Sequence, residues 1–191
     1  MEQRPTDAEA IARAREGDSG AFGVLVTRYE EAAFRAAYLV TRNADDAADV
    51  AQEAFVRAHA RLHTFRQEEP FRPWLLRIVT NLALNQRRSL GRRLGLLERA
   101  GRLLTRDDAP PPEALVMADE TSRTVWDAIN RLGDDDRLVL YMRYFLELSE
   151  AEMARVIDKA PGTVKSRLSR ASARLRDVIE RDYPHLRYGD D

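Results

Sequence analysis

Three stretches of this sequence carry charged and amide side chains at spacings that suit recognition of a polyanion or of another protein. The most unusual is PGTVKSRLSRASARLR (residues 161–176), which has five basic residues and no acidic one, although the formal net charge of the chain is -1. Lys and Arg contact phosphates and guanine edges, and Ser and Thr donate or accept at either. A carboxylate would repel a nucleic acid at such a surface, so its absence predicts a nucleic-acid contact. The alternative is a solvated Arg-rich helix end, although the helix dipole disfavours basic residues in first turns.

The second stretch is FRPWLLRIVTNLALNQRRSLGRR (residues 71–93), where polar side chains recur at helical spacing: Arg77, Asn81, Asn85, Arg88 and Arg92. Asn and Arg suit base edges and phosphates. The aromatic and basic loop before this stretch, with Phe65, Arg66, Phe71 and Arg72, could frame a pocket for an unstacked base. In the alternative interpretation, Phe65, Phe71 and Trp74 are ordinary core residues and the arginine face is solvated.

The third stretch is NADDAADVAQEAFVRA (residues 43–58), in which Asp45, Asp46, Asp49, Gln52 and Glu53 cover the side opposite an apolar stripe. Such a face predicts docking of a basic partner. Helix capping together with a solvated face explains the same residues equally well.

Catalytic and metal-binding patterns are weak. His59 and His63 are spaced for one helix face, but the sequence has no cysteine and no third ligand is evident, so no metal or other cofactor is expected. No P-loop, dinucleotide fingerprint or nucleophile-elbow motif is present, so we do not expect an enzyme.

Composition predicts a folded protein, with 44% hydrophobic and 33% charged residues in 191. The first residues have no apolar signal region, and no apolar run is long enough to cross a membrane. We therefore expect a cytoplasmic location without membrane insertion.

Helical periodicity dominates and no strand is evident. Four helices are expected over about residues 7–17, 19–41, 44–62 and 73–88, and four more after residue 117. Three glycines and three consecutive prolines mark the segment between as a linker, within which residues 94–104 could form a short helix. The sequence thus predicts an all-α fold with two small helical domains joined by a flexible linker.

The last two expected helices, residues 149–157 and 161–181, are separated by a short turn, which is helix-turn-helix spacing. Ser149 and Glu152 form a capping-box pattern, and Pro161 suits a first helical turn. The apolar positions of the second helix step by four and three: Val164, Leu168, Ala171, Leu175 and Val178. This helix is expected to pack by its apolar stripe and to present its basic side chains outward.

Four stretches, taken in order, resemble the extracytoplasmic-function (ECF) group of sigma factors of bacterial RNA polymerase, in the sigma-70 family. They are GDSGAFGVLVTRYE, DDAADVAQEAFVRA, FRPWLLRIVTNLALNQRR and LSEAEMARVIDKAPGTVKSRLSRASARLR. The resemblance implies a second sigma domain at residues 1–92, a linker at 93–117, a fourth sigma domain at 118–181 and a tail at 182–191. The first domain would bind the polymerase and the minus-ten element, and the other would read the minus-thirty-five element.

Carried over by position, the resemblance assigns three sets of residues. The polymerase-binding set is Asp46, Asp49, Gln52, Glu53 and Phe55. The minus-ten set is Phe65, Arg72, Trp74, Arg77, Asn81, Asn85 and Arg88. The minus-thirty-five set is Thr163, Lys165, Ser166, Arg167, Arg170 and Arg174.

Three departures from the family pattern bear on these sets. His59 stands where an aromatic residue is frequent, and Ala48 replaces an acid of the docking motif. Asp158 and Lys159 replace a Gly-aliphatic pair in the turn. Asp tolerates the left-handed conformation, but Lys159 is hard to bury, so unusual turn packing or a slightly weaker domain is expected.

The resemblance implies three partners: the clamp and flap regions of core RNA polymerase, promoter DNA as duplex and opened strand, and, as is common in the group, an anti-sigma factor. The rival interpretation is a helix-turn-helix regulator that acts without entering the polymerase, which would bind duplex DNA alone.

Overall fold

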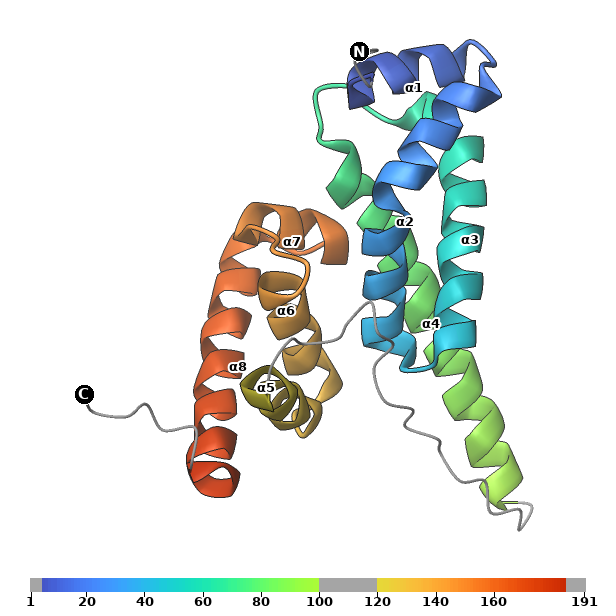
Figure 1. The fold of residues 1–191 in the computed structure, drawn as a ribbon. Helices are drawn as coiled ribbons and strands as arrows, with labels where there is room; N and C mark the ends of the chain where they lie inside the picture. Colours follow the sequence, from blue (N-terminus) through green and yellow to red (C-terminus); the bar gives the residue numbers. More distant parts are fainter. Residues whose placement is uncertain (1–4, 100–119, 185–191) are drawn as a thin grey trace. The chain divides into compact units, whose positions relative to one another are not determined.

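The computed structural model describes residues 5–99 and 120–184, with side chains for 5–89 and 123–184. Over these ranges the chain is helical and has no strand, and it divides into two compact units, Met1–Pro110 and Pro111–Asp191 (Figure 1). The all-α, two-domain prediction is therefore confirmed. The division falls among residues outside the described ranges, so the exact domain limits remain a prediction.

The first unit contains α1 (Asp7–Arg15), α2 (Ser19–Thr41), α3 (Ala44–Ala60), a 3-10 turn η1 (Leu62–Thr64) and α4 (Phe71–Arg99). The long α2 packs against α1, α3 and α4. The buried residues of the helices packed against it are small alanines on α3 (Ala47, Ala54 and Ala58) and branched residues on α4 (Leu75, Leu76 and Val79). The apolar stripe of α3 is buried over its whole length: Ala47, Val50, Ala51, Ala54, Phe55 and Ala58.

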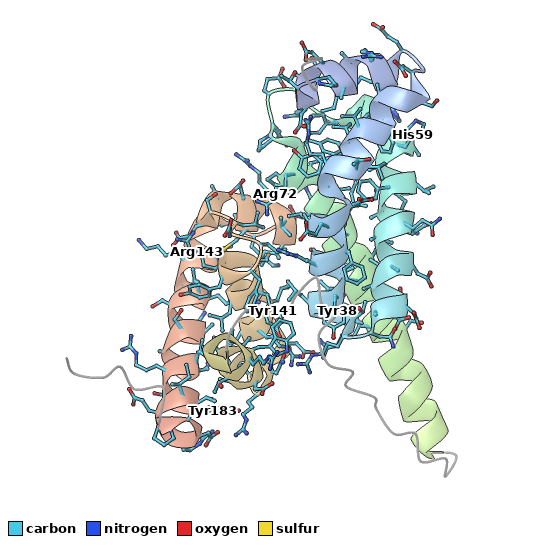
Figure 2. The ribbon with its side chains drawn as sticks, viewed as in Figure 1. Tyr38, His59, Arg72, Tyr141, Arg143 and Tyr183 are labelled. Atoms are coloured by element: carbon cyan, nitrogen blue, oxygen red, sulfur yellow. The ribbon has the colours of Figure 1, made fainter. Side chains whose placement is uncertain are left out.

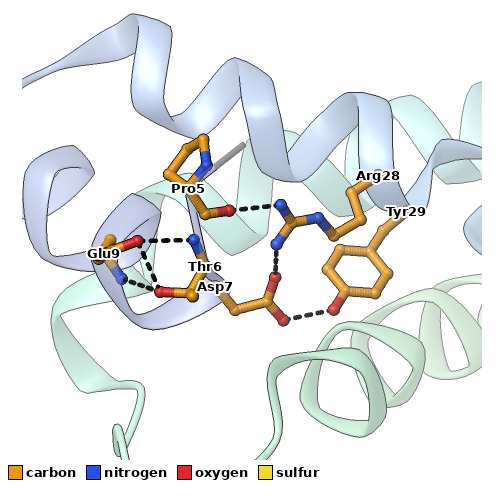
Figure 3. A network of polar contacts seen from close by, with 6 residues as sticks. All are labelled: Pro5, Thr6, Asp7, Glu9, Arg28 and Tyr29. Carbon is orange, nitrogen blue, oxygen red and sulfur yellow. Dashed lines mark hydrogen bonds and ion pairs between the residues drawn. The ribbon is translucent and has the colours of Figure 1, made fainter. Parts of the chain in front are cut away.

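Side chains near Pro5 fix the first helix on the second (Figure 3). Thr6 and Glu9 form a capping box, and the backbone N–H of Thr6 donates to Glu9 Oε2 at 2.8 Å. Asp7 accepts hydrogen bonds from Arg28 and from the hydroxyl of Tyr29, both on α2. Burial and the neighbouring Asp7 raise the pKa of Tyr29, so its hydroxyl remains a donor.

The fourth helix differs from the prediction at both ends. It begins at Phe71 rather than Pro73, because a proline in the first turn costs no intrahelical hydrogen bond. It ends at Arg99, so residues 93–99 of the expected linker, including the start of its expected short helix, continue α4. The triproline and the rest of that linker lie outside the described residues.

The second unit contains α5 (Glu120–Asn130), α6 (Asp134–Tyr144), α7 (Glu150–Ile157) and α8 (Pro161–Asp182). The long α8 packs against the other three helices. Trp126, Tyr141 and Phe145 form a ring cluster between α5 and α6, with Trp126 and Tyr141 centroids 4.9 Å apart. At the end of α8, Tyr183 (Figure 2) lies under the guanidinium of Arg131, which also pairs with Asp182 at 2.7 Å.

Candidate nucleic-acid and protein interfaces

The first candidate interface is the outward side of α8. Its apolar side follows the predicted stripe: Val164, Ala171 and Val178 are buried, and Leu168 and Leu175 are half-buried. The predicted DNA contacts Thr163, Lys165, Ser166, Arg170 and Arg174 are exposed, and Arg167 is half-buried. Packing thus presents one polar, basic surface along the helix.

The turn before α8 has regular geometry despite its unusual residues. Ser149 and Glu152 form the predicted capping box at the start of α7. Asp158 caps the other end in the left-handed conformation (φ 55°), as predicted. Lys159 is exposed, and its N–H donates to the carbonyl oxygen of Ala154 at 3.0 Å. The expected cost of burying Lys159 therefore does not arise, because its side chain reaches solvent.

The basic residues of α8 make polar contacts within the unit. Ser166 Oγ donates to the carbonyl oxygen of Thr163 at 3.0 Å, and Arg170 Nε donates to that of Ser166 at 3.2 Å. Arg167 and Arg174 instead pair with acids in the first turn of α6, Asp135 (2.9 Å) and Asp136. These two ion pairs could not be predicted from the sequence, because they depend on how α6 packs on α8.

The second candidate interface is a polar recess of about 330 Å³ in the first unit. Predicted residues line it from α4 (Trp74, Arg77, Asn81 and Asn85), and Arg57, Arg61 and Thr64 line it from the end of α3 and the turn η1. The last three were missed, although Arg57 and Arg61 share the four-residue spacing used to choose Arg77 and Asn81. The cations, amides and half-buried indole at this recess are suited to bind an unstacked base and its phosphate.

Other members of the minus-ten set lie outside the recess lining. Phe65 is only 4% exposed and packs on Phe71 and Trp74, with centroids 5.6 and 5.1 Å away. It is therefore a core residue that supports Trp74, and its expected direct contact with DNA requires correction. Arg72 is half-buried in the first turn of α4 (Figure 2), and Arg88 is exposed further along the same helix.

The third candidate interface is an apolar groove of about 580 Å³ between α2 and α3. Phe22, Val26 and Phe34 line it from α2, and Phe55, Val56 and His59 from α3. Val56 is 60% exposed, so its apolar side chain is accessible to a partner that enters the groove. The predicted Gln52 also lines this groove, while Asp49 and Glu53 are exposed on the same helix.

Two residues near the groove differ from expectation. Asp46 of the predicted docking set is half-buried, and its Oδ1 accepts a hydrogen bond from Gln86 of α4 at 2.6 Å, so this carboxylate already joins two helices. His59 (Figure 2) meets the ring of Phe22 edge-on, with centroids 4.7 Å apart, so this side chain makes an aromatic contact within the first unit. Among the side chains that the structure describes, in residues 5–89 and 123–184, no three His, Asp or Glu groups are placed to share a metal ion.

Among the described helices, none has the length and hydropathy needed to cross a membrane.

Comparison with known proteins assigns both units. Residues 25–93 match the family model for sigma-70 region 2, and residues 122–175 match that for sigma-70 region 4. The chain is 34% identical over 193 residues to the ECF RNA polymerase sigma-E factor of Haemophilus influenzae, covering 94% of this chain and 98% of that protein. It is 33% identical over 192 residues to the sigma-E factor of Escherichia coli K12, covering 94% and 97%.

Solved structures give the same likeness. The structure of CnrH in complex with the cytosolic domain of CnrY matches with a TM-score of 0.67 and 29% identity, over 92% of this chain and 98% of that one. The sigma factor RpoE of Bartonella quintana, solved with the anti-sigma factor NepR, matches with a TM-score of 0.65 and 24% identity, over 84% and 98%. At that identity, the second match supports the fold alone.

Proposed function

The chain belongs to the ECF group of the sigma-70 family of RNA polymerase sigma factors, and on this premise we propose which of its surfaces meet the polymerase and the promoter. It is a sigma factor that binds core RNA polymerase and directs transcription initiation, while the polymerase supplies the chemistry. The rival interpretation, a regulator that acts outside the polymerase, is not favoured, because it leaves the region 2 match over residues 25–93 without a purpose.

The observation that carries this assignment is the pairing of two DNA-compatible surfaces with two separately folded units. The basic side of α8 belongs to the unit that matches region 4, and the polar recess belongs to the unit that matches region 2. A promoter with two separated elements requires two such readers.

In the proposed mechanism α8 enters the major groove of the minus-thirty-five element. Lys165 and Arg170 are exposed there and carry the charge for phosphate and guanine contacts. Thr163 and Ser166 lie near the first turn, so they reach base edges or the nearest phosphates.

The recess of the first unit would hold a base of the opened minus-ten element. Unpairing a base costs a few kcal/mol, and stacking on Trp74 with hydrogen bonds to Asn81 and Asn85 would offset that cost. Arg57, Arg61 and Arg77 would neutralise the phosphates on either side. Phe65 acts in this proposal through the position of Trp74.

The polymerase clamp would dock on the apolar groove and the acids beside it. Phe55 and Val56 supply apolar area, and Asp49, Gln52 and Glu53 supply a polar rim. Glu53 is paired with Arg57 at 2.7 Å and is exposed, so it can exchange that partner at small cost. We propose that the polymerase flap meets the second unit and that an anti-sigma factor controls the chain; the complex of CnrH with the cytosolic domain of CnrY supports a protein partner.

One experiment tests the proposal as a whole. The purified chain is added to core RNA polymerase that lacks any sigma factor, and the 5′ ends of the transcripts are sequenced. Starts at a defined set of promoters are expected, with shared elements upstream. Transcription without promoter-specific starts, together with tight duplex binding by the chain alone, would favour the stand-alone regulator instead.

A further inference from the structure

Two arginines of α8 are held by acids from another helix, and the two pairs differ in burial. Arg174 pairs with Asp136, whose side chain is only 13% exposed, while 57% of the Arg174 side chain is exposed. Arg167 pairs with Asp135, where the acid is 75% exposed and the arginine 31%. The buried acid therefore holds the more accessible arginine.

We propose that Asp136 is a positioning residue for DNA recognition, which fixes the direction of the Arg174 guanidinium so that it discriminates between promoter sequences. The inference rests on the proposed role of α8 and adds a residue outside the recognition helix that sets its selectivity. Asp135, one position earlier in the same turn, is assigned no such role.

Burial is the reason for the difference between the two acids. An ion pair between exposed side chains is weakened by water and salt and contributes little. Asp136 is mostly shielded from water, so its attraction for Arg174 is stronger and its own position better fixed. It also lies in the first turn of α6, where the helix dipole favours a negative charge.

A held arginine suits specificity because it has less freedom to lose on binding. A free Arg side chain gives up considerable rotamer entropy when it is ordered against DNA, and can adapt to several sequences. Arg174 donates a hydrogen bond from Nη1 to Oδ2 of Asp136. The guanidinium has five N–H donors in a rigid plane, so the other donors remain available in a fixed orientation.

The negative charge of Asp136 also favours selectivity over general affinity for DNA. A carboxylate close to Arg174 partly neutralises it, which reduces its attraction for any phosphate but leaves its hydrogen-bond geometry intact. The pair should thus lower affinity for all DNA slightly and penalise mismatched sequences more. An autoinhibitory pair would have a different signature, since breaking it would increase binding to the matched element at least as much as to others.

The test compares Asp136→Asn with Asp135→Asn, which removes the same charge one residue away. Each full-length variant is assembled with core polymerase, and binding is measured on promoters with matched and mismatched upstream elements. Asp136→Asn is expected to lower the matched-to-mismatched ratio about fivefold, which is within the range of one good base contact. Asp135→Asn should leave that ratio within about twofold of the wild type, and both should bind mismatched DNA slightly better.

A double variant separates positioning from general damage to the unit. In an Arg174→Ala background, Asp136→Asn should cause no further loss of the ratio, whereas a purely structural role would lower it again. If Asp136→Asn proves poorly folded, Asp136→Glu provides a second test. It keeps the negative charge and should retain more of the selectivity than Asp136→Asn.

The outcomes also distinguish this inference from the proposed function. If Arg170→Ala lowers the ratio while Asp136→Asn and Asp135→Asn behave alike, the inference is wrong and α8 still reads DNA. If Arg170→Ala and Arg174→Ala leave both the ratio and the overall affinity for DNA unchanged, the assignment of α8 itself is wrong.

Discussion

Arg15 on α1 donates from Nε to the carbonyl oxygen of Leu62 at 3.0 Å, across 47 positions of sequence. A second N–H of the same guanidinium reaches the carbonyl oxygen of Phe65. These carbonyls flank Thr64, which lines the polar recess, and Phe65 supports the Trp74 ring. The first helix is thereby connected to the surface proposed to hold an opened base.

Arg15→Ala should impair promoter opening. Loss of two hydrogen bonds from a charged donor should lower the free energy of unfolding by about 1 kcal/mol, since the carbonyls regain water, and should loosen the turn that shapes the recess. Permanganate reactivity of the opened strand reports the defect. Arg13→Ala is the matched control, because Arg13 pairs with Asp18 at 2.7 Å and does not contact this turn. Equal opening by the two variants would show that the link to Leu62 has no role there.

Asn81→Ala should weaken opening more than duplex binding. Asn81 is exposed at the recess, so its loss removes hydrogen bonds to an unpaired base and leaves the core intact. Gel-shift affinity for closed duplex promoter, measured with the assembled polymerase, should change by less than about twofold, while permanganate signals at the minus-ten element fall. Footprints that match the wild type in both assays would remove Asn81 from the proposed site.

Local features of the fold were predictable because they depend on residues within one or two turns. Ser149 and Glu152 form the capping box that their spacing predicts. Asp158 adopts the left-handed conformation for the same local reason. The start of α4 was missed because Pro73 was interpreted as a helix boundary, although the first turn tolerates it.

Features that require two helices to meet were not predictable. The burial of Trp126 depends on Tyr141 of α6 and on Phe145, which follows that helix. The hydrogen bond from Gln86 to Asp46 depends on how α4 packs on α3. Phe65 was placed among the DNA contacts for the same reason: the sequence does not show that Phe71 and Trp74 pack over its ring. The faces of single helices were foreseen, while the partners across helices were not.

Val56→Glu should weaken polymerase binding at least tenfold without unfolding the protein. The side chain is 60% exposed at the apolar groove, so a carboxylate there remains hydrated in the free chain but would be buried in the complex. Binding to core polymerase and the melting temperature are the two measurements. Ala44→Glu adds the same charge at the exposed start of α3, outside the groove lining, and should bind like the wild type. Unchanged binding by Val56→Glu would place the docking surface elsewhere.

Arg170→Ala should reduce selectivity for the upstream element by about 1–3 kcal/mol. Its Nε is held by the Ser166 carbonyl at 3.2 Å, which directs the remaining donors outward from the exposed side of α8. Competition between matched and mismatched elements, at fixed salt, measures the change. A uniform loss across all sequences would instead identify Arg170 as a phosphate contact.

Asp18 should make the first unit sensitive to acid. Its carboxylate accepts a hydrogen bond from the N–H of Ala21 at 3.0 Å, which is the main cause of its lowered pKa, and Arg13 adds to the effect. Because the pKa is lower in the folded than in the unfolded chain, the stabilisation is present above about pH 4 and is lost as the pH falls through the folded value. Asp18→Asn keeps an N-cap acceptor without a titrating group, so its melting temperature should be close to that of the wild type at pH 7 and should fall less between about pH 5 and 3.

Asp45→Asn, at an exposed acid in the first turn of α3, controls for the removal of one charge. If the wild type and Asp18→Asn lose melting temperature in parallel over that range, the cap at Asp18 does not carry the acid response.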